Sequence, residues 1–188
     1  LEPKAAFSGA EKTVEAVRTF LKKAGEVLKG DEPANMVLLR GFAQLPGWPS
    51  FPEVFGLRAA AIAGYPMYKG LARLLGMDIL ETEPDMESEL KVLRQQWSGY
   101  DFFYVHFKPT DSTGEDGDFD RKVKMIEQVD AVIPQLQELK PDVMVVTGDH
   151  STPARMKFHS WHPVPVLLWS RTCRTDGVRS FGEQACLA

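Results

Sequence analysis

The stretch PDVMVVTGDHSTPARMKFHSWHPVPVLLW, from Pro141 to Trp169, decides the fold class that the sequence predicts. Two short apolar runs, at 142–147 and 163–169, flank a polar segment. That segment leaves little room for the crossover helix that two parallel neighbouring strands would need. The spacing therefore predicts an antiparallel pair of strands, with Asp149, His150 and His159 at one end of a sheet.

Upstream of this stretch, apolar runs of strand length alternate with segments of helical periodicity. Strands are expected at 57–63, 77–80 and 101–107, and helices at 66–75, 87–97 and from the capping residue Asp118 through Leu136. We expect the apolar positions between Val123 and Leu136 to face the core, and the polar segment 108–118 to be a loop. Because the strands are apolar on both faces and helices separate them, the pattern predicts an α/β fold with a mostly parallel sheet flanked by helices.

The first fifty residues differ from the rest. A capping-box pattern, SGAE at Ser8, precedes a predicted helix that ends at Gly30. The run MVLLR at 36–40 reads as a short buried strand. The segment 41–52, rich in glycine, proline and aromatic residues, is the best candidate for a domain boundary. The sequence thus predicts two parts, 1–50 and 51–188.

Composition narrows the classes of function. The chain has 188 residues, a net charge of −4 and a pI of about 5.6, which argues against a nucleic-acid or anionic-membrane partner. No apolar run approaches the roughly 20 residues of a membrane span, and no signal peptide is visible. The two cysteines, Cys173 and Cys186, lack metal-knuckle spacing, so we expect a reducing, cytoplasmic environment.

Two polar segments follow predicted strands, and ligands of open α/β sheets bind beyond the carboxyl ends of strands. The first, 108–118, carries Asp111 and Glu115, and the second carries Asp149, His150 and His159. Mixed carboxylate and imidazole donors suit zinc, manganese or iron, and two such ions can clamp a phosphoryl group. Each segment alone also fits a helix cap or a hydrogen-bonded turn. The residue pattern alone leaves both interpretations open.

Three longer motifs carry a resemblance to a known family. PANMVLLRG (33–41), DFFYVHFKPTDSTGEDGDFDRKVKMIEQVD (101–130) and VVTGDHSTPARMKFHSWHPVPVLL (145–168) resemble the archaeal-type cofactor-independent phosphoglycerate mutases. These enzymes belong to the alkaline phosphatase superfamily of metalloenzymes. The resemblance implies an alkaline-phosphatase-like core interrupted by a smaller domain. Residues 1–50 would be the C-terminal part of that inserted substrate-binding domain, and residues 51–188 the C-terminal part of the metal-binding core.

The resemblance also implies a site with two divalent metal ions. Asp111 and His159 match ligands of one ion, and Asp149 and His150 match ligands of the other. Glu115 stands where the family usually has a histidine. A carboxylate at this position hardens the site, so manganese is expected, with magnesium or zinc as alternatives.

For the substrate, 2- or 3-phosphoglycerate by resemblance, Arg40 and Lys69 are the candidate binding residues, because phosphate and carboxylate groups need cations. Of the other histidines, His106 is expected to be a core histidine with satisfied hydrogen bonds, and His162 a structural or supporting residue.

The family's phosphate-accepting serine and one further metal-binding aspartate lie in an N-terminal part of the core that this chain lacks. We therefore expect the full protein to interconvert 2- and 3-phosphoglycerate through a phosphoserine, and the isolated chain to be inactive and to bind metal weakly or not at all. Two alternatives remain. One is a phosphohydrolase or another phosphoryl-transfer enzyme of the superfamily. The other is a degenerate, non-catalytic member, which the substitution at Glu115 favours.

Overall fold

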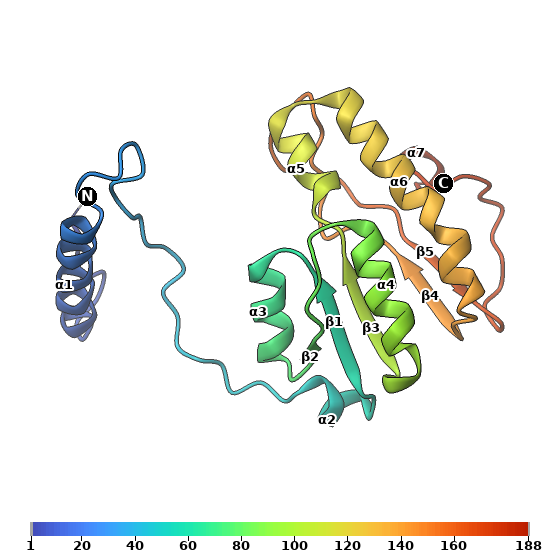
Figure 1. Ribbon diagram of the computed structural model, residues 1–188, viewed down its shortest axis with the longest axis horizontal. Helices are drawn as coiled ribbons and strands as arrows, with labels where there is room; N and C mark the ends of the chain where they lie inside the picture. Colours follow the sequence, from blue (N-terminus) through green and yellow to red (C-terminus); the bar gives the residue numbers. More distant parts are fainter. Residues whose placement is uncertain (1, 188) are drawn as a thin grey trace. The chain divides into compact units, whose positions relative to one another are not determined.

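The computed structural model describes residues 2–187. The chain forms two compact units, residues 1–46 and residues 47–188 (Figure 1). Within the described residues, the first unit contains one helix, α1 (Glu11–Val27), and every strand belongs to the second unit. The division falls inside the segment 41–52 that the sequence marks as a candidate boundary.

Helix α1 begins later than its capping-box pattern predicts. Its N-cap is Ala10, which makes no side-chain cap, and the Gly9 N–H donates instead to Glu11 Oε2 at 2.7 Å. Gly9 has φ +98°, a left-handed conformation that interrupts the helical path after Ser8. The predicted capping box at Ser8 is therefore wrong, because Glu11 occupies the first position of the helix rather than its third.

The predicted strand at 36–40 is also wrong. Residues 31–50 form neither helix nor strand, and Met36 and Leu38 are 70% and 76% exposed. A strand is stable only when neighbouring strands satisfy its backbone hydrogen bonds, and no strand of the described chain pairs with this run. Apolar composition alone does not supply that partner.

A three-stranded parallel sheet with the order β2-β1-β3 forms the centre of the second unit. Strand β1 (Ala59–Ala63) pairs with β2 (Asp78–Ile79) on one side and with β3 (Phe102–His106) on the other, where Ala63 lies opposite His106. All five residues of β1 are buried. The connections between these strands contain α3 (Pro66–Leu74) and then α4 (Met86–Gln96) with the 3₁₀ turn η1 (Trp97–Gly99).

Helices α4 and α6 (Phe119–Glu138) lie on one face of these strands (Figure 1). The core cluster joins Ile62 of β1 to Leu90 and Leu93 of α4 and to Val132 of α6. Asp118 caps α6 as predicted, accepting a hydrogen bond from the Arg121 N–H at 3.0 Å. The apolar stripe of α6 is core only in its C-terminal half, since its N-terminal members Val123 and Ile126 are 37% and 50% exposed.

Strands β4 (Val143–Val146) and β5 (Leu167–Ser170) form a separate two-stranded sheet. They are antiparallel, with Val146 opposite Leu167, which confirms the prediction from the Pro141–Trp169 stretch. The three parallel strands and their helices confirm the α/β class with a mostly parallel sheet. One face of β4 is open, because Val143 and Val145 are 57% and 55% exposed.

Helices lie partly or wholly within two segments, 41–52 and 108–118, that the sequence predicts to be loops. Helix α2 (Phe51–Phe55) starts at Ser50, which forms a capping box with Glu53. Helix α5 (Pro109–Asp116) occupies most of the predicted loop 108–118. Proline at its first position favours helix initiation, and Gly117, at φ +75°, ends it in the left-handed conformation. The last element of the described residues is the short helix α7 (Glu183–Cys186).

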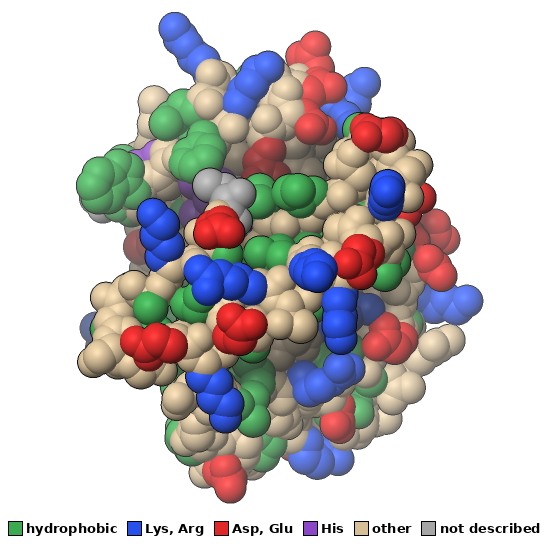
Figure 2. All heavy atoms as spheres, turned by 90° about the vertical axis from the view of Figure 1, so that its left-hand side faces the viewer, with side chains coloured by type: hydrophobic (Ala, Val, Ile, Leu, Met, Phe, Trp, Pro, Cys, Tyr) green, Lys and Arg blue, Asp and Glu red, His purple; other side chains and the backbone are tan. Residues whose placement is uncertain are grey.

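Figure 2 shows lysine and arginine side chains interspersed with aspartate and glutamate over one face. Among residues 2–187, no helix has both the length and the apolar character needed to cross a bilayer.

Candidate metal centre

Two elements supply the candidate metal-binding side chains. Helix α5 carries Asp111 and Glu115 one turn apart, so both lie on the same side of the helix. The segment that follows β4 folds back on itself through an isolated antiparallel bridge between Ser151 and Ser160, whose N–H donates to the Ser151 carbonyl at 2.9 Å. That bridge brings the neighbouring histidines, nine residues apart in sequence, face to face.

The imidazole rings of His150 and His159 stack with their centroids 3.7 Å apart. His159 Nε2 lies 3.8 Å from Asp111 Oδ1 and 3.6 Å from Glu115 Oε1. His150 Nδ1 lies 3.9 Å from Asp111 Oδ1, and His150 Nε2 lies 3.6 Å from Asp149 Oδ2. The five side chains predicted from the sequence therefore form one continuous cluster.

The spacing of these atoms fits divalent metal binding. Two atoms that bind one ion at about 2.1 Å are separated by at most about 4.2 Å, and each of the four distances above lies below that limit. Asp111, His150 and His159 also offer one ligand atom each, all within 4.8 Å of one another. The donors are carboxylate oxygens and imidazole nitrogens, the combination that first-row divalent ions accept.

Both aspartates of the cluster are held in the ionised form. Burial raises the pKa of Asp111, but hydrogen bonds from Lys108 and Thr152 outweigh it and hold the pKa below its ordinary value. Burial likewise raises the pKa of Asp149. The hydrogen bond from Tyr68 and the charge of His150 outweigh burial, so the pKa of Asp149 lies below its ordinary value. Ionised carboxylates are the form that binds metal.

Close backbone contact joins the two elements of the cluster. A Cβ atom added to Gly114 in α5 would lie 2.1 Å from the carbonyl oxygen of Thr152. Glycine is required here because the backbone of α5 packs directly against the backbone of the segment after β4. This contact brings Thr152 Oγ1 within hydrogen-bonding distance of Asp111 Oδ1 and 3.1 Å from His150 Nδ1.

The remaining sequence candidates lie outside the cluster. Lys69, on α3, forms an ion pair with Glu81 at 2.6 Å. Arg40 is an exposed residue of the first compact unit and lies in no helix or strand. His162 Nδ1 lies 2.9 Å from Ser160 Oγ, which is a structural contact of the kind expected.

His106 differs from its prediction. Its ring stacks on Tyr68 with a centroid distance of 3.7 Å, but its buried Nδ1 has no hydrogen-bond partner within residues 2–187. The expectation of a fully satisfied core histidine is therefore wrong. His106 is the last residue of β3, and its ring stacks on Tyr68 of α3 instead of facing a polar group.

Three residues that contact the cluster were not predicted as site residues: Tyr68, Lys108 and Thr152. Lys108 and Thr152 lie within three residues of Asp111 and His150 in the same motifs, so proximity in sequence was an available signal. Tyr68 is 81 residues from Asp149, and only the tertiary fold brings these two residues together.

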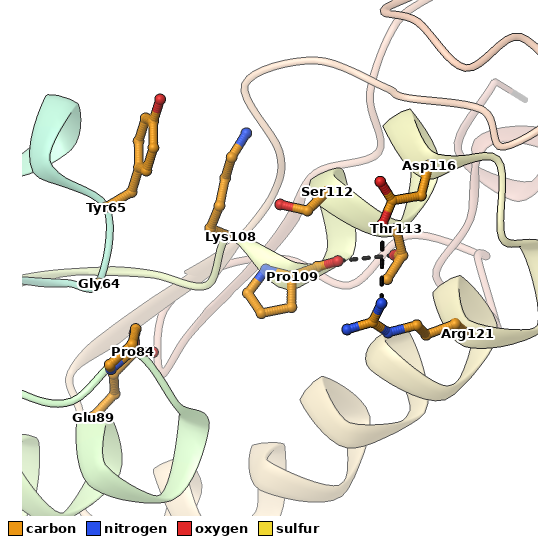
Figure 3. A pocket seen from close by; sticks show the side chains of 10 residues that line it. All are labelled: Gly64, Tyr65, Pro84, Glu89, Lys108, Pro109, Ser112, Thr113, Asp116 and Arg121. Carbon is orange, nitrogen blue, oxygen red and sulfur yellow. Dashed lines mark hydrogen bonds and ion pairs between the residues drawn. The ribbon is translucent and has the colours of Figure 1, made fainter. Parts of the chain in front are cut away.

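A pocket of about 300 Å³ lies beside the cluster (Figure 3). Ser112, Thr113 and Asp116 of α5 line it, whereas Asp111 and Glu115 face the histidines, so the helix separates the two sites. Lys108 belongs to both, since it lines the pocket and pairs with Asp111. The other lining residues are Gly64, Tyr65, Pro84, Glu89, Pro109 and Arg121.

Curated relatives resemble this chain along most of its length. A probable 2,3-bisphosphoglycerate-independent phosphoglycerate mutase of Thermotoga neapolitana is 54% identical over 94% of the chain and 44% of the relative. A relative of the same name from Aquifex aeolicus is 50% identical over 100% of the chain and 46% of its own length. The chain thus spans about half the length of the curated relatives it matches.

Solved structures share the fold. A protein of Pyrococcus horikoshii superposes with a TM-score of 0.84 at 32% identity, covering 96% of this chain and 53% of that one. A cofactor-independent phosphoglycerate mutase of Thermoplasma acidophilum gives a TM-score of 0.64 at 24% identity, over 98% and 49% of the two chains, which supports the fold alone. The family model of the Metalloenzyme superfamily matches residues 15–188, and with this match over nearly the whole chain, the protein belongs to the Metalloenzyme superfamily.

Proposed function

We propose that this chain supplies the metal-binding part of a cofactor-independent phosphoglycerate mutase, which interconverts 2- and 3-phosphoglycerate in the cytoplasm. The observation that carries the proposal is the convergence of α5 with the segment after β4 into one cluster of three carboxylates and two imidazoles. The names of the curated relatives point to the same reaction. Both cysteines are free thiols, which fits a reducing compartment.

The four distances allow the donor atoms to be assigned to two groups, which His150 links because its Nδ1 lies 3.9 Å from Asp111 Oδ1. Asp111 Oδ1, Glu115 Oε1 and His159 Nε2 form one group, and Asp149 Oδ2 and His150 Nε2 form the other. This division supports two divalent ions, and three carboxylates beside two imidazoles favour manganese over zinc. When bound, such ions lower the pKa of a coordinated hydroxyl group and neutralise charge on a phosphoryl group.

Arg40 and Lys69 remain the proposed substrate-binding residues. We propose that Arg40 belongs to the inserted domain, residues 1–50, and Lys69 to the core, residues 51–188. The proposal for Lys69 is supported by its neighbour in sequence, Tyr68, whose hydroxyl group contacts Asp149. In the structure the Lys69 ammonium group is paired with the exposed Glu81. An exposed carboxylate is readily exchanged for a substrate phosphate, because surface ion pairs contribute little free energy.

Mutase activity is tested on the complete protein that the reading frame encodes, loaded with Mn²⁺ and supplied with 3-phosphoglycerate. Formation of 2-phosphoglycerate without stoichiometric free phosphate is the expected result. Release of free phosphate without 2-phosphoglycerate would instead identify a phosphohydrolase. The 188-residue chain assayed in parallel is expected to be inactive.

The role of Glu115 is tested by Glu115→His, with Asp116→Asn as the matched control on the same helix. Asp116 is exposed, and among residues 2–187 its one ion pair is with Arg121, at 3.9 Å. We expect Glu115→His to shift the metal content of the complete protein from manganese towards zinc, because imidazole is a softer ligand than carboxylate, and we expect Asp116→Asn to leave it unchanged. Metal content is measured by mass spectrometry. If wild type, Glu115→His and Asp116→Asn contain the same metals in the same amounts, Glu115 is not a metal ligand.

A further inference from the structure

Helix α3 reaches the metal cluster through one side chain. The Tyr68 hydroxyl group donates a hydrogen bond of 2.8 Å to Asp149 Oδ2, across 81 residues of sequence. The other carboxylate oxygen, Asp149 Oδ1, accepts the N–H of His150 at 3.2 Å. Both oxygens of Asp149 therefore have a donor, and Oδ2 at the same time faces His150 Nε2 at 3.6 Å.

The ring of Tyr68 is held independently of this hydrogen bond. It stacks on His106, the last residue of β3, with a centroid distance of 3.7 Å and an interplanar angle of 27°. The ring of Tyr65 lies nearby, with its centroid 6.1 Å away in a tilted arrangement. Strand β3 and the start of α3 thus fix where the hydroxyl group points.

Asp149 needs such a constraint. Its side chain is 55% exposed, and it lies in the irregular segment after β4, where no helix or strand limits its rotamer. A free carboxylate at this position would lose conformational entropy whenever it bound an ion. A hydrogen bond from a rigid neighbouring element removes that loss in advance and orients the second oxygen lone pair.

We propose that Tyr68 is a positioning residue, whose hydroxyl group orients the Asp149 carboxylate to share a divalent cation with His150. The inference rests on the proposed metal centre and assigns a residue that none of the sequence motifs contains. Tyr68 acts through Asp149 and contacts neither ion nor substrate in this role.

The test compares Tyr68→Phe with Tyr65→Phe in the complete protein, with Mn²⁺ alone as the probe. Tyr68→Phe keeps the ring and its stacking on His106 and removes only the donor. We expect its affinity for Mn²⁺, measured by calorimetry, to fall by about 10- to 100-fold, whereas Tyr65→Phe binds Mn²⁺ as the wild type does. Thermal unfolding without metal is expected to be the same in all three proteins.

A double-mutant cycle with Asp149→Asn separates positioning from packing. If Tyr68 acts through Asp149, adding Tyr68→Phe to Asp149→Asn causes little further loss of Mn²⁺ affinity. Wild-type affinity in Tyr68→Phe, equal losses in Tyr68→Phe and Tyr65→Phe, or fully additive losses in the cycle would each overturn the proposal. A wild-type protein that binds Mn²⁺ but does not isomerise phosphoglycerate refutes the mutase while leaving this comparison valid.

Discussion

Glu89, on the first turns of α4, is the most deeply buried ionisable side chain described. It is 2% exposed, and its Oε2 has no hydrogen-bond partner in residues 2–187. Burial, helped by the nearby charge of Asp85, raises its pKa to about 7, while the Gly64 N–H acts in the opposite direction. Glu89 is therefore largely neutral in the folded protein at pH values where the unfolded chain is already ionised.

This difference predicts a stability that falls with pH. The folded pKa lies above the unfolded value of 4.5, so the contribution is complete below pH 4.5, decreases between pH 4.5 and 7, and is lost above that range. The full effect amounts to roughly 3 kcal/mol. Glu89→Gln removes this dependence, so its free energy of unfolding relative to wild type should rise from pH 4.5 to pH 7.5.

The measurement is urea unfolding of the chain at several pH values. Glu87→Gln, on the same turn but exposed, serves as the control and should show no such trend. If Glu89→Gln and wild type lose stability in parallel between pH 4.5 and 7.5, Glu89 is not the group that titrates.

At the scale of elements, α5 holds the candidate metal-binding cluster together, because it presents Asp111 and Glu115 on one face and packs tightly against Thr152. Glycine at position 114 permits that approach. A β-carbon there would meet the Thr152 carbonyl oxygen at 2.1 Å and the Lys122 ammonium at 3.1 Å. Since the closest of these atoms belongs to the backbone, the two elements would have to separate.

Gly114→Ala is therefore expected to destabilise the chain by about 1–3 kcal/mol, the usual cost of overpacking, and to abolish Mn²⁺ binding by the complete protein. Gly70→Ala, in α3, is the matched control, because a β-carbon at Gly70 meets no atom within 4 Å. That change should stabilise the helix by roughly 0.5–1 kcal/mol. Changes of opposite sign in the free energy of unfolding, measured with urea, would support the contact between Gly114 and Thr152. Equal changes in the two variants would contradict it.

At the scale of the whole molecule, the segment 31–50 has neither helix nor strand, and it includes the division between the two compact units. Proteases cut exposed segments that lack regular hydrogen bonds. Limited trypsin digestion should therefore cleave early after Arg40, which is exposed, and this cut leaves the candidate metal cluster in one fragment. A first cut between residues 59 and 106, detected by mass spectrometry, would show that the parallel sheet opens more easily than this segment.

Local sequence signals correctly predicted two kinds of element. They are helix ends that capping residues stabilise and a strand that is buried on both faces. The fully apolar run that became β1, the proline and glycine that bound α3, and the Asp118 cap of α6 all lie where the pattern places them. The antiparallel β4–β5 pair followed from the short polar connection. The strand predicted at 36–40 failed because a strand requires a partner that composition does not reveal.

For the candidate site, the sequence alone determined the types of donor and the two segments that carry them, because acidic and imidazole side chains follow apolar runs of strand length within recognisable motifs. The tertiary structure alone decided that Asp111 meets His150 and His159, that α5 is a helix and that Tyr68 reaches Asp149. The physical reason is distance along the chain. Contacts across 40 or 80 residues depend on strand register and on the packing space that Gly114 leaves open, and no local pattern encodes either.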